Sequence, residues 1–244
     1  MLSRIFRKFS PVLAVLVVLV FAGLYNNADA QVIARMTNPQ AGSVVVPGQP
    51  ILITWDVNVV PIGKKGTLPT YLEQEVYASF DGGSTYELIT AELPITERSF
   101  TWTVPDLPGK NILIDIRCGN GVRGPEFFNR QPTFKIMGGG IKGITTTVPA
   151  ITLNEIEKRK VSPGEQVEIG WNVNFENVDT YDVKVSFDEG LHMQKVDSTK
   201  NQSVIWTVPE GVSSSRIVFQ VAAKTTDGRK FVTRIPVKPM LIVE

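Results

Sequence analysis

The sequence has one cysteine, Cys118, and one histidine, His192, among its 244 residues. A single cysteine cannot form an intramolecular disulfide, so each folded unit must be stabilised by its apolar core. A bridge to another chain is the alternative role for Cys118. One thiol and one imidazole cannot supply the clustered ligands of a zinc site. The sequence therefore predicts no metal and no cofactor.

Neither sign of charge is in large excess, since 25 basic residues face 24 acidic ones. Proteins that bind nucleic acid usually carry a basic surface that neutralises phosphates. The balance predicts that nucleic acid is not a partner.

Long apolar runs are also scarce, and the one that stands out covers residues 12–24. It follows three basic residues, Arg4, Arg7 and Lys8, and precedes the small residues 28–30. This order is typical of a secretory signal peptide, here cleaved after Ala30. The run is shorter than the roughly 20 residues of a membrane span, although an uncleaved anchor is the alternative. We expect a secreted, periplasmic or cell-surface protein that contacts a membrane only if this segment is retained.

The rest of the chain contains one pattern twice. Three segments of the first copy, 47–58, 79–83 and 102–105, return as 163–174, 186–190 and 206–209. A repeat of about a hundred residues has the usual size of one β domain. The sequence predicts a signal peptide over 1–30, domains over 31–137 and 147–244, and a glycine-rich linker over 138–146. Glycine removes backbone restraint, so we expect the domains to pivot at the linker.

Apolar residues alternate within each copy, as at Ile51, Ile53, Trp55 and Val57 in the first. This period is typical of strands with one buried face, and seven short strands fit each copy. The sequence predicts an all-β protein made of two tandem immunoglobulin-like antiparallel β-sandwich domains.

The tryptophans are Trp55, Trp102, Trp171 and Trp206. Each shares the register of the inward-facing aliphatic residues of its own strand. Burial of one indole contributes roughly 4–6 kcal/mol before entropy costs. We therefore predict that the tryptophans form the cores and do not form a sugar-binding platform.

A turn is expected at Asp81, Gly82 and Gly83, because aspartate accepts backbone N–H groups and glycine takes positive φ. Residues 79–86 resemble the Asp-box, with Tyr86 in place of the more usual tryptophan. In sialidase-like propellers that box is a structural hairpin remote from the chemistry, so the resemblance implies no catalysis. The second copy departs from the pattern after Asp188.

Over a whole copy, the order of these motifs resembles immunoglobulin-like and fibronectin type III-like modules found in tandem on secreted bacterial proteins. It is similar more weakly to the amino-terminal module of a family of fungal cell-wall proteins, whose serine- and threonine-rich tail is missing here. The resemblance implies a sandwich fold and roles as spacers, adhesins or accessory domains.

Catalytic patterns are not found. No Gly-x-Ser-x-Gly elbow occurs, and Cys118 and His192 fall in different copies. Four carboxylates could in principle form a glycosidase pair, Asp81, Asp115, Glu126 and Asp188, but such a pair needs a cleft that small sandwiches rarely provide. The prediction is that the protein is not an enzyme, with a glycan-active enzyme as the third alternative.

Two loops are longer in the first copy, one near residues 61–69 and one over 119–130. In an immunoglobulin-type sandwich these loops emerge at the same end. Together they would present a cationic and aromatic partner site, made of Lys64, Lys65, Tyr71, Arg123, Phe127, Phe128 and Arg130. The alternative is that Phe127 and Phe128 cover their own core and the charges are ordinary loop residues.

These observations predict an exported, non-catalytic binding or structural module of the cell envelope, acting in protein–protein interaction or adhesion. The expected partner is an envelope or extracellular protein. The alternative is a carbohydrate-binding accessory protein whose ligand is a glycan.

Overall fold

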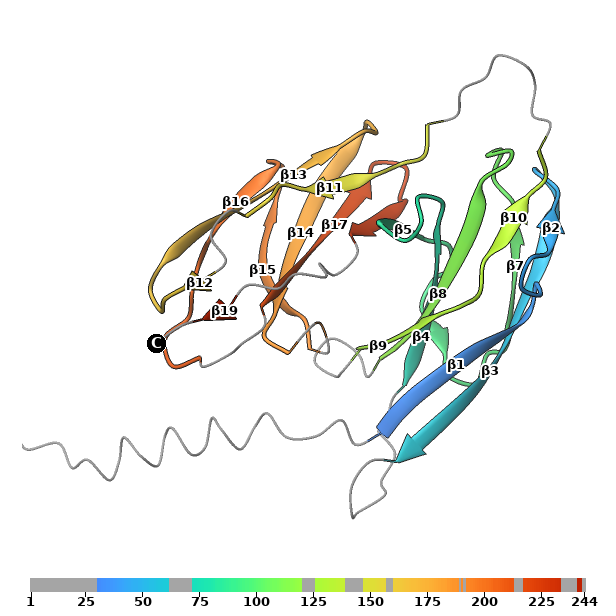
Figure 1. Ribbon diagram of the computed structural model, residues 1–244, viewed down its shortest axis with the longest axis horizontal. Coiled ribbons are helices and arrows are strands. Elements are labelled where there is room, and N and C mark those ends of the chain that lie inside the picture. The colour runs from blue at the N-terminus through green and yellow to red at the C-terminus, as the bar shows by residue number, and fades with distance from the viewer. Residues whose placement is uncertain are drawn as a thin grey trace, which may run out of the picture.

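The computed structural model describes residues 30–61, 72–119, 126–138, 147–156, 160–188, 190, 192–212, 217–233 and 241–242. These residues form strands and connecting turns, arranged as two tandem immunoglobulin-like β-sandwiches that lie side by side (Figure 1). The all-β prediction is confirmed. Over the same ranges, no helix has the length and apolarity needed to cross a bilayer.

The first domain packs one three-stranded sheet against a larger one. The smaller sheet has the antiparallel order β1 (Ala30–Asn38), β3 (Pro50–Pro61), β7 (Ser99–Thr103). The larger has the order β5 (Thr85–Leu88), β4 (Glu73–Ser79), β8 (Asn111–Gly119), β10 (Phe134–Ile136), β2 (Val44–Val45). Two short strands join it, β6 (Leu93–Pro94) on β4 and β9 (Glu126–Arg130) on β8.

The second domain repeats this division. Its smaller sheet has the order β11 (Ile151–Leu153), β13 (Gln166–Val173), β16 (Ser203–Thr207). Its larger sheet has the order β15 (Gln194–Thr199), β14 (Val178–Ser186), β17 (Val218–Thr225), β18 (Lys230–Thr233). A parallel pair, β12 (Lys160–Val161) and β19 (Leu241–Ile242), forms a separate two-stranded sheet, with Val161 buried in the second core.

Burial follows the alternation of the sequence on the smaller sheets. On β3, Ile53 and Trp55 are buried while Leu52 between them is 50% exposed. Two separate apolar cores result, one within each sandwich. Each domain therefore has the core that an independently folded β domain requires.

Trp55 on β3 and Trp171 on β13 are both buried, but they differ in the hydrogen bonding of the indole N–H. The indole N–H of Trp55 donates to Oε1 of Gln74 at 3.0 Å, and the Gln74 amide in turn donates to the carbonyl of Pro94 at 2.8 Å. In the second domain Tyr181 takes the place of Gln74, and its ring packs edge-on against Trp171 at 5.2 Å. Nε1 of Trp171 has no hydrogen-bond partner in the described part of the chain.

The larger sheets of the two domains are joined edge to edge. Strand β18 of the second domain pairs antiparallel with β5 of the first, with Val232 opposite Tyr86 and Thr233 opposite Thr85. One sheet of eleven strands thus runs through both sandwiches (Figure 1). The pivoting that the glycine-rich linker predicts would break this pairing.

We expect Trp55→Phe to cost about 1–3 kcal/mol more unfolding free energy than Trp171→Phe. Both changes remove similar apolar area, but only the first leaves a hydrogen-bonding group, Oε1 of Gln74, buried without its donor. Urea unfolding of the two variants, followed by circular dichroism, measures the difference. Equal losses would contradict this account of the Gln74 bond.

Cys118 is buried in the first core, and this burial, with a smaller contribution from the charge of Asp115, raises the pKa of its thiol to about 12. Since the thiolate is the reactive form, we expect iodoacetamide at mildly alkaline pH to leave the native protein unmodified. The same reagent should label Cys118 fully in denaturing urea, as measured by mass spectrometry. Rapid labelling without urea would contradict the placement of Cys118.

Candidate functional site

The strands that face the other domain are buried on both sides. On β8, Ile114 and Ile116 point into the first core, while Asp115 and Arg117 occupy the opposite face and are buried as well. On β17 of the second domain, Gln220 lies buried in the same way between core residues. Docking of the two sandwiches thus encloses polar side chains that a single domain would expose to water.

Apolar contacts hold this interface together. Tyr77, Tyr86 and Leu113 of the first domain form a buried cluster with Ala222 and Val232 of the second. The cluster belongs to neither domain core. Its residues therefore stabilise the contact between the domains more than either fold.

Polar contacts reinforce the same interface. The Thr85 hydroxyl accepts a hydrogen bond from the backbone N–H of Ile151 at 2.8 Å. Nε of Arg229 lies 2.8 Å from Oε1 of Glu87, in a partly exposed ion pair. Such a pair contributes little energy by itself, and the backbone pairing of β18 with β5 sets the register of the two strands.

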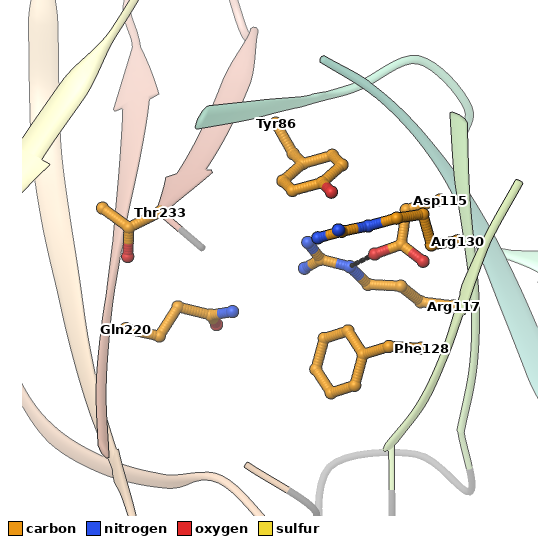
Figure 2. Close-up of a pocket in the computed structure, with 7 residues that line it drawn as sticks. All are labelled: Tyr86, Asp115, Arg117, Phe128, Arg130, Gln220 and Thr233. Atoms are coloured by element: carbon orange, nitrogen blue, oxygen red, sulfur yellow. Dashed lines mark hydrogen bonds and ion pairs between the residues drawn. The ribbon is translucent and has the colours of Figure 1, made fainter. Parts of the chain in front are cut away.

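A cavity of about 260 Å³ lies beside this cluster. Figure 2 shows Arg117 and Arg130 of the first domain extending towards Gln220 and Thr233 of the second. The residues that line this cavity are Tyr86, Asp115, Arg117, Phe128 and Arg130 from the first domain and Gln220 and Thr233 from the second.

Arg117 is fixed by a carboxylate on one side and by aromatic rings on the others. Its Nε lies 3.1 Å from Oδ2 of Asp115, and both side chains are nearly fully buried. Its guanidinium carbon lies 3.9 Å from the centroid of the Tyr77 ring and 5.0 Å from that of Phe128. These are cation–π distances, so the guanidinium is held in one orientation.

Two residues that line the cavity each have one buried polar atom without a hydrogen-bond partner within the described ranges. These atoms are Oδ1 of Asp115, which is an acceptor, and Nε2 of Gln220, which is a donor. Both residues are 4% exposed. Buried polar groups in native proteins are nearly always bonded to protein or to ordered water, so this acceptor and this donor each need a partner from a water or from another small polar molecule.

Arg130 and Tyr86 close the cavity on the side of the first domain. Arg130 donates a hydrogen bond to the Tyr86 hydroxyl. Burial, assisted by the charge of Asp115, raises the pKa of Tyr86 in spite of the nearby arginines, so the hydroxyl stays protonated at neutral pH. Gly83 above it has φ +91°, and an added Cβ would lie 2.9 Å from the hydroxyl oxygen. The turn and the cavity therefore both require glycine there.

The turn at Asp81 has the form that its sequence predicts. One carboxylate oxygen of Asp81 accepts the backbone N–H of Ser84 at 3.0 Å and of Thr85 at 2.9 Å, and Gly82 and Gly83 both have positive φ. The hairpin thus begins β5, the strand that meets the second domain.

The second copy builds a similar turn although its sequence departs from the pattern. Asp188 accepts bonds from the Ser186 hydroxyl and the His192 backbone N–H. Burial raises the pKa of Asp188, but the bonds from Ser186 and His192 outweigh it and hold the pKa below its usual value. The only histidine of the chain is thus part of a turn.

The structure describes only three of the seven residues of the predicted partner site. Lys64, Lys65, Tyr71 and Arg123 lie outside the described residues. The segment with Phe127, Phe128 and Arg130 was expected to be a loop, and this was wrong: these residues form strand β9, with Phe127 opposite Cys118 and Phe128 opposite Arg117.

Because neighbouring residues of a strand point to opposite faces, β9 separates its two phenylalanines. Phe127 packs against the first core, whereas Phe128 and Arg130 line the cavity. The expected alternative, in which phenylalanine covers its own core, applies to Phe127 only. The tryptophans lie in the cores as expected, with Trp102 half-buried and stacked on Phe80.

Sequence reasoning missed the role of Asp115, Arg117, Gln220 and Thr233. The available signal was the outward face of two strands, where Leu113, Val218 and Ala222 are apolar. Single apolar residues on a surface are normal, but several gathered on one outward face indicate that another surface covers it.

No protein-family model matches the chain, and no curated protein matches it. Several solved structures are similar to the chain. The fibronectin(III)-like modules of CbhA from Clostridium thermocellum are 14% identical, with 83% of this chain and 90% of that chain covered and a TM-score of 0.27. Three N-terminal domains of the Hoc capsid protein of bacteriophage RB49 are 12% identical, with 88% and 71% covered and a TM-score of 0.28. The fold of this chain is established by its own strand order and register.

We expect Val232→Glu to separate the two domains while each sandwich stays folded. The carboxylate would be buried in the interdomain cluster at a cost of several kcal/mol, and Val232 belongs to neither core. Small-angle X-ray scattering should then show a larger radius of gyration. Val44→Glu, at a position 57% exposed, is the control that should leave the radius unchanged. An unchanged radius in Val232→Glu would contradict the role of the cluster.

Proposed function

We propose that the protein is an exported, non-catalytic module of the cell envelope that presents two fixed β-sandwiches to a protein partner. The observation that carries this proposal is the pairing of β5 with β18, which continues one sheet through both domains. Domains joined only by a flexible linker change their relative orientation freely. Domains that share a sheet offer a partner one surface of constant shape, which lowers the entropy cost of binding.

Export is supported by the first thirty residues, whose order is typical of a signal peptide. Cleavage after Ala30 would leave nearly all of β1, which pairs with β3 over its length. The mature protein would therefore keep the edge of its first sheet.

A non-catalytic role is supported by what the candidate catalytic groups do. Asp81 and Asp188 accept the hydrogen bonds of their own turns, and Asp115 is paired with Arg117. Cys118 is buried with a raised pKa. The turns account for Asp81 and Asp188 and the core accounts for Cys118, while one oxygen of Asp115 is held by Arg117.

The burial of the aromatic side chains favours a protein partner over an insoluble glycan. Polysaccharide platforms need exposed aromatic faces, and over the described ranges no tryptophan, tyrosine or phenylalanine is exposed. The partner surface that remains is the end of the first domain where the predicted loops begin. There Glu73 pairs with Gly119, and Gly119 pairs with Glu126. In the chain, Lys64, Lys65 and Tyr71 lie between β3 and β4 and Arg123 lies between β8 and β9, and we propose that these residues contact the partner.

The test uses the full chain, expressed in its native cell with a photo-crosslinking residue at Lys65. We expect the mature protein to start at Gln31, to be found in the envelope fraction, and to form an adduct with one protein. A second chain with the crosslinker at Lys195, on the exposed edge strand β15, is the matched control and should form none.

Arg123→Glu should abolish the Lys65 adduct by reversing a charge of the same surface, while the protein amount stays constant. Retention in the cytosol without cleavage would contradict export. Equal adducts from both positions, or adducts that survive Arg123→Glu, would place the partner elsewhere.

A further inference from the structure

The cavity between the domains has the composition of a ligand site that the proposed function does not use. Both sandwiches line it, and two of its lining residues, Asp115 and Gln220, each have a buried polar atom without a partner among the described residues. We propose that it binds one small hydroxylated carboxylic acid, of the size and chemistry of a monosaccharide uronic acid.

The charges of the wall select a monoanion. Arg117 and Arg130 both line the cavity, and Asp115 neutralises only one of them. Arg130 bonds to the neutral hydroxyl of Tyr86. One positive charge is therefore left, on a side chain that solvent also reaches, and it can form a charge-assisted hydrogen bond to an anion. A carboxylate supplies a single negative charge, whereas a phosphate group carries more at neutral pH.

The unpartnered atoms require hydroxyl groups as well. Oδ1 of Asp115 needs a donor, but the other oxygen of this carboxylate already holds the cation of Arg117. A ligand ammonium group at Oδ1 would be repelled by that guanidinium, so a neutral hydroxyl is the donor that fits. Nε2 of Gln220 points across the cavity in Figure 2 and would donate to a hydroxyl or carboxylate oxygen of the same molecule.

The size and the aromatic walls complete the match. A volume of about 260 Å³ lies just below the range of drug-sized pockets and suits a single small molecule. The rings of Tyr86 and Phe128 line it and offer apolar surface to the C–H face of a sugar ring. Because the polar groups come from both domains, the bound acid would bridge the first and second sandwich.

This inference does not rest on the proposed function, because the cavity and the loop end of the first domain are different surfaces. The absence of a partner crosslink would not contradict the ligand proposal, and the absence of ligand binding would not contradict the partner proposal.

Isothermal titration calorimetry of the purified protein at low salt tests the inference with three probes. Glucuronate carries the carboxylate and the hydroxyls, glucose the hydroxyls alone, and acetate the carboxylate alone. We expect saturable binding of glucuronate at millimolar concentration or below, and at least tenfold weaker binding of glucose and acetate.

Two variants locate the binding. Gln220→Leu removes the unpartnered donor at similar side-chain volume, and Arg130→Gln removes the charge from an exposed residue. Each substitution should lower the affinity for glucuronate at least tenfold. Arg35→Gln, at an exposed position of β1 that does not line the cavity, is the matched control and should bind as the parent does. Circular dichroism and the thermal midpoint confirm that each variant is folded.

Three results would overturn the proposal. The first is no saturable glucuronate binding, which would mean that the cavity holds solvent only. The second is equal affinity for the three probes, which would show that the site does not recognise the carboxylate and the hydroxyl groups of one molecule together. The third is binding that is unchanged in both folded cavity variants, which would place the ligand elsewhere.

Discussion

The antiparallel pairing between β5 and β18 is the contact on which the rest of this structure depends. It joins an edge of the first domain's larger sheet to an edge of the second domain's larger sheet. Free edges of a sheet expose unpaired backbone groups and invite association with other chains. Here two such edges satisfy each other within one chain, and the outer faces of β8 and β17 are covered as a consequence.

Covering these faces changes the chemistry of the residues on them. Asp115 and Arg117 would form an exposed pair of little energetic weight in an isolated domain. In the joined protein they are nearly fully buried, where breaking such a pair is costly because one charge would be left alone. The interface therefore builds a charged, aromatic cavity from side chains that neither domain could bury by itself.

The two copies of the repeat show how one fold tolerates different local solutions. Trp55 has its indole hydrogen bond satisfied by Gln74, whereas Trp171 has a tyrosine ring as its neighbour. The turns at Asp81 and Asp188 place their carboxylates alike with different flanking residues. In both cases the backbone geometry is common to the copies, and the side chains around it differ.

Much of each sandwich could be predicted from residue patterns alone. Period-2 alternation placed Ile53 and Trp55 in a core, and the Asp-Gly-Gly order placed the turn before β5, because both depend on neighbours within a few residues. The strand at β9 was missed since its register is set by β8 across the hairpin. The cavity was beyond sequence reasoning, because Asp115 and Gln220 meet only when two separately folded units dock. Local periodicity thus determined the fold of each half, and tertiary contact between the halves decided which polar residues became a site.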